Sequence, residues 1–472
     1  SLRRVTHYDY WSDRLMPSIL VDSGADLLFY GMAEKSLMEF VRLVQRGVPI
    51  AGITNLPQTA FLRPHDTPYA TQSRWEELLL ASHEACMADK KTYAGNFRHV
   101  EEESNKLHAR KLIQGVGEQR VVINPPWPPL TEKEMDRIWD LPYTRRPHPR
   151  YQGKGPIPAF EMIRYSVNIH RGCFGGCAFC TISAHQGKFI SSRSPESVMR
   201  EVDAITHMEE FKGYLSDIGG PSANMYQMKG MNLEICARCS RPSCIFPAIC
   251  KNLDTNHQPL IDLYRQVRNH PGIKKAFIGS GIRYDLFLKP AGRPETDQAN
   301  RTYLREVIRH HVSGRLKVAP EHTSDEVLQL MRKPSFQLFT QLNREFQKIN
   351  REENLRQQLI PYFISSHPAC HPGDMADLAV KTKALDFQLE QVQDFTPTPM
   401  TLATEIYYSG YHPYTLEKVY TARSVTERKN QRQFFFWYKK EYRQAITLEL
   451  KRIGRSELIP KLFGTSGAKP RE

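Results

Sequence analysis

The chain has 472 residues, a formal net charge of +14 and nine cysteines. This length accommodates roughly two or three domains, or one barrel with additions. No apolar run approaches the roughly 20 residues needed to span a bilayer, which excludes an integral membrane protein built from helices. The sequence begins at Ser1 with neither an initiating methionine nor a signal peptide, so we expect a soluble, cytoplasmic chain that is a fragment of a longer protein.

The first third of the chain divides into two segments by composition. Residues 20–50 contain a strand, "DLLFYG", followed by an amphipathic helix. This single α/β unit predicts that residues 1–55 are the end of a doubly wound α/β domain that is cut off at Ser1. Residues 56–155 are rich in charge and proline, with "NPPWPPL" near their end, and predict helices joined by a long connection.

Residues 156–420 have a different pattern, in which short apolar runs precede helical stretches. Six such runs occur, at residues 163–170, 213–219, 274–281, 315–322, 358–365 and 390–397. Strands that alternate with helices predict a parallel sheet that closes into a full or partial barrel. Ligand-binding groups of such barrels gather where the strands end and the loops begin. Cys173, Gly219, Gly220, Ser280 and Glu321 all fall at these positions.

The first strand leads into the stretch "HRGCFGGCAFC", which contains Cys173, Cys177 and Cys180. The glycines of this stretch allow the loop to curl so that three thiolates converge. Zinc prefers four ligands, and His170 or His185 could complete a Cys₃His site. Structural zinc sites usually take their ligands from two knuckles, whereas closely spaced cysteines on one loop suit a [4Fe–4S] cluster. Three protein ligands would leave one iron open for a substrate, and we favour this interpretation.

The loop between the second and third strands carries a second group of cysteines. The stretch "CARCSRPSCIFPAIC" contains Cys236, Cys239, Cys244 and Cys250. Dense cysteines in a cytosolic chain favour metal binding over a disulfide framework, which is typical of small secreted domains. Four ligands so close together could form a closed zinc site or an auxiliary iron–sulfur cluster. The pattern predicts a second metal site and leaves the metal open.

Residues 421–472 form a basic C-terminal extension that we expect to be helical. Within it, residues 423–472 hold 13 Lys or Arg and 5 Asp or Glu. The stretch "RQFFFWYKKEYR" interleaves aromatic and basic side chains, as surfaces that bind single-stranded nucleic acid do. The same aromatics at helical spacing also make a buried face, and "FFFWY" with "AITLEL" is too apolar for a free arm. We therefore expect the tail to pack on the barrel, with only weak, salt-sensitive binding of nucleic acid.

The cysteine motif C-x3-C-x2-C, with Phe179 before its last cysteine and a (βα)₆ barrel around it, resembles the radical S-adenosylmethionine (SAM) superfamily. More closely, residues 1 to about 460 resemble the YgiQ-type proteins, an uncharacterised UPF0313-like group. The stretches that carry this resemblance are "SLRRVTHYDYWSD", "RGCFGGCAFCTISAHQGK", "IGGPSANMY", "SCIFPAIC", "GSGIRYDL" and "KVAPEHT". The YgiQ-type pattern includes the last three cysteines of the second group, which makes Cys236 an addition.

The resemblance implies a mechanism and a set of cofactors. Cys173, Cys177 and Cys180 would bind a [4Fe–4S] cluster whose open iron is chelated by SAM. One electron from the reduced cluster, supplied by flavodoxin or ferredoxin, would cleave SAM to methionine and a 5′-deoxyadenosyl radical. That radical would abstract hydrogen from a substrate that the sequence does not identify, and the protein would bind, orient and exclude water.

The resemblance also implies contacts between SAM and residues at the strand ends. Pro221 departs from the family's glycine-rich motif, which usually has Glu at that place. Each contact residue could instead be an ordinary core or strand-end residue. The residues are Phe179 on the adenine side, Gly219 and Gly220 at the methionyl end, and Ser280, Arg283 and Glu321 toward the ribose and carboxylate.

Two other functions remain open at this point. One is a radical SAM enzyme of RNA modification with an auxiliary cluster, which the basic charge favours although no recognised RNA-binding module is present. The other is a zinc-stabilised nucleic-acid-binding protein without catalysis. The α/β unit before residue 55 resembles the end of the cobalamin-binding domain that precedes many radical SAM barrels, and the use of cobalamin also stays open.

Overall fold

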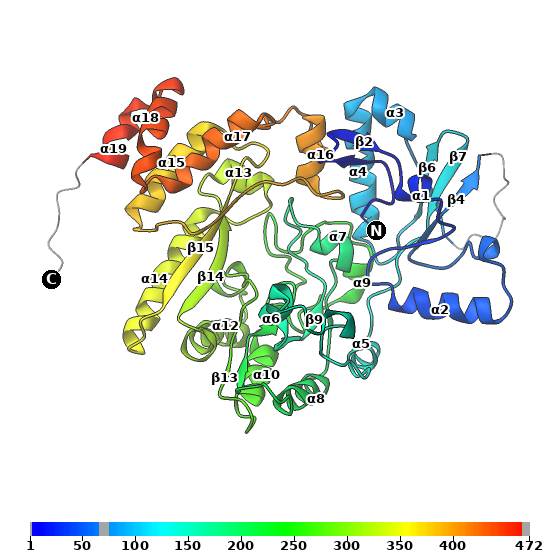
Figure 1. Cartoon of the computed structure of the whole chain (residues 1–472), viewed down its shortest axis with the longest axis horizontal. Helices are drawn as coiled ribbons and strands as arrows, with labels where there is room; N and C mark the ends of the chain where they lie inside the picture. Colours follow the sequence, from blue (N-terminus) through cyan, green and yellow to red (C-terminus); the bar gives the residue numbers. More distant parts are fainter. Residues whose placement is uncertain (1, 66–74, 465–472) are drawn as a thin grey trace.

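The computed structural model describes residues 2–65 and 75–464 of the chain. Along the chain there is an N-terminal part built on a sheet, then a partial barrel of parallel strands, and then a group of C-terminal helices (Figure 1). None of the helices in these residues has the length and apolar character needed to cross a membrane.

The N-terminal part centres on a five-stranded mixed sheet in the order β3-β4-β7-β6-β5. All neighbouring strands are antiparallel except β5 and β6, which run parallel. Its strands are β3 (Leu28–Phe29), β4 (Thr59–Pro64), β5 (Glu77–Leu80), β6 (Lys111–Val116) and β7 (Gln119–Ile123). A hairpin of β1 (His7–Asp9) and β2 (Arg14–Met16) precedes the sheet.

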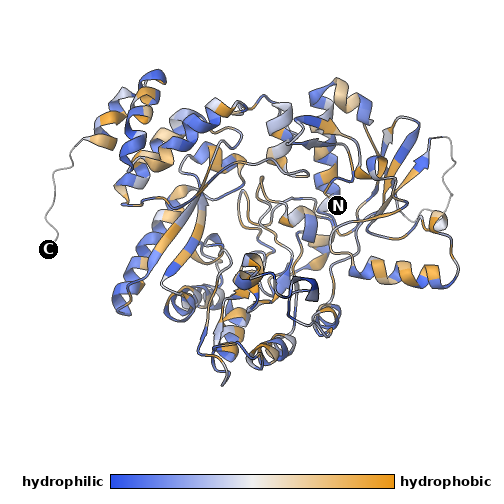
Figure 2. Ribbon diagram, viewed as in Figure 1, coloured by the Kyte–Doolittle hydropathy of each residue, from blue (hydrophilic) through white to orange (hydrophobic). Residues whose placement is uncertain are grey.

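Helices surround this sheet. As the sequence predicts, an amphipathic helix, α2 (Glu34–Gln45), follows β3, and apolar and polar residues alternate around it in Figure 2. A longer helix, α4 (Lys90–Ser104), begins at Asp89, whose side chain accepts hydrogen bonds from the first-turn amides. Of the shorter helices, α1 (Ile19–Ser23) contacts β4 and α3 (His83–Ala88) contacts β6, whereas α5 (Glu132–Trp139) and α6 (Pro158–Ile163) follow the sheet in the chain and lie beside the barrel (Figure 1).

This sheet differs from the division predicted at residue 55. β3 pairs antiparallel with β4, and residues 56–155 supply four of the five strands in addition to the predicted helices. The strands "KLIQGV" and "QRVVI" are short apolar runs inside a strongly charged segment, so composition conceals them. Antiparallel pairing between strands far apart in the chain depends on tertiary contacts that local patterns do not encode.

The six predicted strands are all present, and their pairing is parallel. β8 (Ser166–Asn168) pairs with β12 (Asp217–Gly219), and β11 (Tyr214–Leu215) pairs with β13 (Lys275–Ala276). β14 (Arg315–Glu321) pairs with β15 (Gln358–Ser365), which pairs with β16 (Gln391–Asp394). These ladders form separate sheets, so the barrel is partial, and the chain is α/β as expected.

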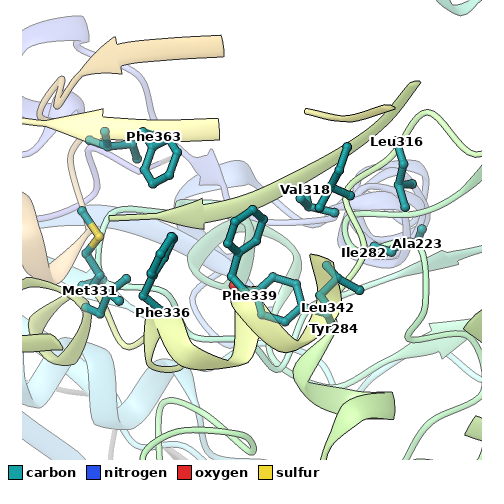
Figure 3. Close-up of a cluster of buried hydrophobic side chains, with 14 of the residues drawn as sticks. Ala223, Ile282, Tyr284, Leu316, Val318, Met331, Phe336, Phe339, Leu342 and Phe363 are labelled. Atoms are coloured by element: carbon teal, nitrogen blue, oxygen red, sulfur yellow. The ribbon is translucent and has the colours of Figure 1, made fainter. Parts of the chain in front are cut away.

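Helices cover the outside of the strands and supply the core. Phe336, Phe339 and Leu342 of the long helix after β14 point toward the apolar side chains of that strand (Figure 3). Burial of one such phenylalanine contributes about 2 kcal/mol. These helices are α8 (Pro195–Thr206), α10 (Gln258–Arg268), α12 (Pro294–Glu306), α14 (Phe336–Glu352) and α15 (Pro372–Ala384).

The C-terminal segment is helical and packs on α15, as Figure 1 shows at the upper left. Phe434 and Phe435 are fully buried, whereas Lys439 and Lys440 are exposed. The prediction that the tail packs with its charges outward is therefore confirmed; Lys469 and Arg471 lie outside the described residues. The helices of this segment are α17 (Val425–Arg432), α18 (Arg443–Arg452) and α19 (Ile459–Phe463), whereas α16 (Leu402–Ser409), which precedes them, packs on α4.

Candidate functional site

The three cysteines of the first group lie on the loop between β9 (His170–Arg171) and α7 (Ile182–Gln186), just beyond the first barrel strand. Gly172 and Gly176 have φ values of 88° and 61°, a region that residues with side chains rarely adopt. A Cβ at Gly175 would lie 3.2 Å from Cys173 Sγ and 3.9 Å from Cys177 Sγ. The glycines therefore allow the loop to curl so that the thiols of Cys173 and Cys177 both lie next to Gly175.

This loop is held in place by hydrogen bonds from distant parts of the chain. The Ala178 N–H donates to Met331 O at 3.0 Å, and the Ala403 N–H donates to Ala178 O at 2.8 Å. Arg332 Nη1 donates to the carbonyl of Gly176 at 3.4 Å. The position of the cysteines is thus fixed by the barrel and by the segment that leads into α16.

Burial and a cation shape the chemistry of the thiols. Burial raises the pKa of Cys173 to about 11 and that of Cys180 to about 12, and the neighbouring Cys177 thiol adds to both shifts. Arg283 Nη1 donates to Cys177 Sγ at 3.3 Å, and Asp285 holds the same guanidinium through bonds of 3.0 and 2.6 Å. Without a metal the two buried thiols are protonated at neutral pH, so metal binding has to displace protons.

The geometry of the site bears on the kind of metal it suits. Within residues 2–65 and 75–464, no three His, Cys, Asp or Glu side chains converge closely enough to hold one metal ion. An iron–sulfur cubane takes its thiolates on different irons, so its ligands need not meet at one point. A small pocket borders Cys177 and Cys180.

The end of the second strand is packed closely against its neighbours. A Cβ at Gly220 would lie 2.4 Å from the His170 ring, so that position requires glycine, and Gly219 ends β12 beside it. The Ser280 hydroxyl is bonded to the carboxylate of Asp217, and the Ser280 N–H donates to the same carboxylate at 3.1 Å. Ser280 is thus engaged within the protein, whereas the sequence predicts a contact with SAM.

Glu321, at the end of β14, has one engaged and one unengaged carboxylate oxygen. Its Oε1 lies 3.5 Å from Lys333 Nζ, while Oε2 is buried without a hydrogen-bond partner among the residues that the structure describes. Burial raises the pKa of Glu321, and the positive charge of Lys333 opposes that shift. A buried carboxylate oxygen of this kind is ready to accept a hydrogen bond from a ligand.

Other buried polar groups without partners occur at the same end of the barrel. An unpaired buried polar group costs about 1–3 kcal/mol, so native proteins keep few of them without a reason. They follow different strands, whose carboxyl ends meet at one edge because the strands are parallel. In the described part of the chain, these atoms include Ser222 Oγ, Tyr284 Oη, Glu321 Oε2, Thr323 Oγ1, Ser366 Oγ and His367 Nε2.

Phe179 is half-buried, and its ring lies edge-on to that of His367 with centroids 5.9 Å apart. Burial lowers the pKa of His367 to about 4 and that of His322 to about 3, so both rings are neutral near pH 7. Neither His367 nor Lys333 is among the site residues predicted from the sequence. His367 follows the fifth predicted strand directly, which is a usable signal, whereas Lys333 comes from a turn before α14 that has no comparable signature.

The cysteines of the second group are also neighbours in space, although no three of their thiols meet at one point. Cys236, Cys244 and Cys250 border one cavity, and Lys188 Nζ lies 3.9 Å from the Sγ of Cys239, the fourth member. Burial raises the pKa of Cys244 to about 11; Lys188 opposes that shift and the other three thiols add to it. All nine cysteines of the chain lie in the described residues, and none of them forms a disulfide there.

Comparison with known proteins places this arrangement in a family. The Radical SAM N-terminal family matches residues 1–166, and a domain of unknown function, DUF3362, matches residues 390–462. A solved structure of TsrM from Kitasatospora setae, a radical SAM methyltransferase with cobalamin and a [4Fe–4S] cluster bound, gives a TM-score of 0.42 at 12% identity. That alignment covers 94% of this chain and 78% of the TsrM chain.

Much closer relatives exist among curated proteins. A UPF0313 protein of Bacteroides thetaiotaomicron is 59% identical, and the alignment covers 98% of this chain and 76% of the relative. A UPF0313 protein of Porphyromonas gingivalis is 58% identical, with 98% and 73% covered. The chain therefore belongs to the UPF0313 family and is a radical SAM enzyme whose reaction is unspecified.

Proposed function

We propose that Cys173, Cys177 and Cys180 hold a [4Fe–4S] cluster with which the enzyme cleaves SAM reductively and acts on an unidentified substrate. The observation that carries this proposal is that a loop with three thiols and a set of buried, unpartnered polar atoms lie at the same end of one barrel. The residues fit the cofactor pair, because three thiolates leave one iron open and the polar atoms remain available to a polar ligand.

When bound, the cluster would supply one electron to the sulfonium of SAM, releasing methionine and a 5′-deoxyadenosyl radical. The chain's own residues would set the conditions for that chemistry. Arg283, fixed by Asp285, places a positive charge beside Cys177 and offsets the negative charge of the thiolates. The thiols are partly buried on their loop, which limits their contact with water.

Glu321 and its neighbours would bind and orient SAM. The free Oε2 of Glu321 would accept a hydrogen bond from a hydroxyl or amino group, and the charge of Lys333 would favour the ionised carboxylate against the effect of burial. Phe179 and the neutral ring of His367 would form an apolar wall next to it. The backbone of Gly219 and Gly220 would face the methionyl end. Ser280 has no direct role in this proposal, because its hydroxyl is bonded to Asp217.

The electron would come from a reduced flavodoxin or ferredoxin, and the enzyme would work in the cytoplasm. The support for this setting is the chain's unpaired cysteines, since free thiols persist in reducing compartments. No feature of the barrel end identifies the substrate, which would enter from the same side as SAM if the usual arrangement of active sites at strand ends applies.

The test is to purify the protein anaerobically, measure iron and sulfide, and follow 5′-deoxyadenosine formation from SAM with dithionite as reductant. Changing Cys173, Cys177 and Cys180 together to Ala should abolish the product, because the cluster that SAM must contact is lost. Cys86→Ala is the matched control, since Cys86 is buried between α3 and α4, outside both cysteine groups. Product formation by the triple variant would show the assignment to be wrong.

A further inference from the structure

The second cysteine loop is bonded directly to the first. The Cys244 N–H donates to the carbonyl of Phe174 at 3.0 Å, and Ser243 Oγ donates to Gly175 O at 2.8 Å. The two turns are in tight contact, since a Cβ on Gly176 would lie 2.4 Å from Pro242 O. Phe174 directly follows Cys173 in the chain. A path of covalent bonds and one hydrogen bond therefore joins Cys244 to Cys173.

Lys188 is a buried cation whose nearest anionic candidates are these thiols. Its side chain is 1% exposed, and Nζ donates to Arg241 O at 2.8 Å beside Cys239 Sγ. Within the residues described, Lys188 forms no ion pair with a carboxylate. Burying an ammonium without a counter-charge costs several kcal/mol. Thiolates at the second group, made permanent by a metal, would provide that counter-charge.

The loop between β12 and α10 is also braced by its own hydrogen bonds. The Cys250 N–H donates to Cys244 O at 2.7 Å, and Arg241 donates to Phe246 O at 2.8 Å. Asn252 donates through its amide to Asn232 O at 2.8 Å. A metal that served only to staple this loop would duplicate these bonds. A metal that transfers electrons would not duplicate these bonds, because electron transfer depends on the position of the metal relative to the first cysteine loop.

We propose that Cys236, Cys239, Cys244 and Cys250 hold a second [4Fe–4S] cluster that passes single electrons to the cluster on the first loop. Four thiolates leave no open iron, so this cluster would carry electrons and would not bind SAM. In the transfer step the second cluster is oxidised from the 1+ to the 2+ state while the first is reduced from 2+ to 1+. A low-potential one-electron donor, such as dithionite, restores the second cluster.

The surroundings of the loop suit an entry point for electrons. Inside, Cys244 and Cys250 pack against an apolar cluster that contains Phe174, Met228 and Leu253. Outside, Leu233 and Ile235 of α9 (Leu233–Ala237) are 62% and 55% exposed, so the loop reaches the surface. A donor in solution could therefore approach the second cluster without entering the barrel. The metal assignment stands by itself, whereas the transfer of electrons rests on the proposed function.

The metal assignment is tested on the variant in which Cys173, Cys177 and Cys180 are Ala, reconstituted anaerobically with iron and sulfide. We expect about four irons and four sulfides per chain and, after dithionite, an EPR signal of a reduced [4Fe–4S] cluster. Adding SAM should leave that signal unchanged, because no iron is open. Zinc in place of iron, a folded protein without metal, or a signal that SAM alters would each overturn the assignment.

Lys188 provides a second readout. In the same triple variant, Lys188→Met should shift the midpoint potential of the cluster to more negative values, because a nearby positive charge stabilises the reduced state. Lys188→Arg should restore most of the original potential. An unchanged potential in Lys188→Met would contradict the placement of the cluster beside this residue.

The transfer of electrons is tested by changing all four cysteines of the second group to Ser and measuring, by stopped flow, how fast dithionite reduces the first cluster. We expect at least a tenfold slower reduction, and an unchanged rate would overturn the relay. If the quadruple variant fails to fold, Cys236→Ser alone should slow reduction in the same direction. Wild-type protein that keeps the second EPR signal but makes no 5′-deoxyadenosine would contradict the proposed function while leaving the second cluster in place.

Discussion

Glu405 is a buried carboxyl group in α16 that faces α4 across the boundary between the N-terminal part and the barrel. Burial raises its pKa to about 8, a hydrogen bond with Tyr93 opposes that shift, and the negative charge of Glu101 adds to it. Near neutral pH the carboxyl group is therefore mostly protonated. Its ionisation would place an uncompensated charge between two packed helices.

This residue predicts a pH-dependent stability. The folded-state pKa of about 8 lies above the ordinary value of 4.5, so the unfolded state loses its proton first as pH rises. The contribution of Glu405 is fully present below about pH 4.5 and is lost as pH rises to about 8. Glu405→Gln should therefore unfold at a higher temperature than wild type at pH 8.5, with little difference at pH 5. Glu326→Gln, an exposed carboxylate, is the control, and equal behaviour of the two variants would contradict this account.

At the scale of single residues, candidate site residues that follow a regular spacing can be predicted from the sequence, whereas contacts that depend on packing cannot. The cysteines of both groups are visible from their spacing, and Glu321 from its place at a strand end. The engagement of Ser280 by Asp217 is not visible, because the two residues come from neighbouring strands whose register the sequence does not state. Lys333 lies in the turn before α14, and no local pattern indicates that it contacts Glu321.

Among the elements, α4 and the turn after α13 (Asp325–Leu330) act together on the first cysteine loop. Arg332 forms two bonds to the carboxylate of Glu101, at 2.7 and 2.9 Å, and Tyr414 donates to the same carboxylate at 2.6 Å. The side chains of Arg332 and Glu101 are only 9% and 14% exposed. Because Arg332 also donates to Gly176 O, this ion pair connects the N-terminal part to the cysteine loop.

Breaking this pair should therefore weaken both the fold and the loop. Glu101→Gln leaves the buried guanidinium of Arg332 without its counter-charge and should lower the free energy of unfolding by about 3 kcal/mol. The adjacent Glu102 pairs with Arg98 at the surface of the same helix, so Glu102→Gln should cost less than about 1 kcal/mol. Urea unfolding measures both changes. A similar loss in the two variants would show that the Arg332 pair has no special role.

Elements that follow a local period are predictable, and those that depend on distant pairing are not. The barrel strands stand out because each apolar run precedes an amphipathic helix, and all six are found. β4 and β7 are hard to recognise because they pair with each other about 60 residues apart along the chain and carry charged residues, such as Arg63 and Arg120, at paired positions. The predicted boundary at residue 55 consequently cuts through a sheet.

At the scale of the whole molecule, the basic C-terminal helices have two candidate roles, which are binding nucleic acid and stabilising the fold. Phe434, Phe435, Ile446 and Leu450 are fully buried, and Lys383 of α15 donates to carbonyls of α19 at 2.7 and 2.9 Å. Ending the chain at Ala422 would expose this core. Reversing surface charges is therefore a better test of nucleic-acid binding than shortening the chain, because it leaves the buried core intact.

We predict that Lys439→Glu, Lys440→Glu and Lys451→Glu combined leave the thermal stability nearly unchanged, because all three side chains are exposed. Binding of tRNA by the wild-type chain should be weak at about 50 mM salt and lost at about 200 mM, as purely electrostatic contacts are. Anisotropy titrations of both proteins at both salts measure this. Tight, salt-resistant binding that the charge reversals abolish would favour an RNA-modifying enzyme.

The central claim is that three thiolates on one loop leave an iron to which SAM binds. The most direct measurement is Mössbauer spectroscopy of the iron-57-reconstituted chain in which Cys236, Cys239, Cys244 and Cys250 are Ser, with and without SAM. We predict a [4Fe–4S] spectrum in which SAM changes the isomer shift of one iron in four, since one iron lacks a cysteine ligand. A cluster whose four irons all remain unchanged when SAM is added, in a variant that is folded by circular dichroism, would contradict the account.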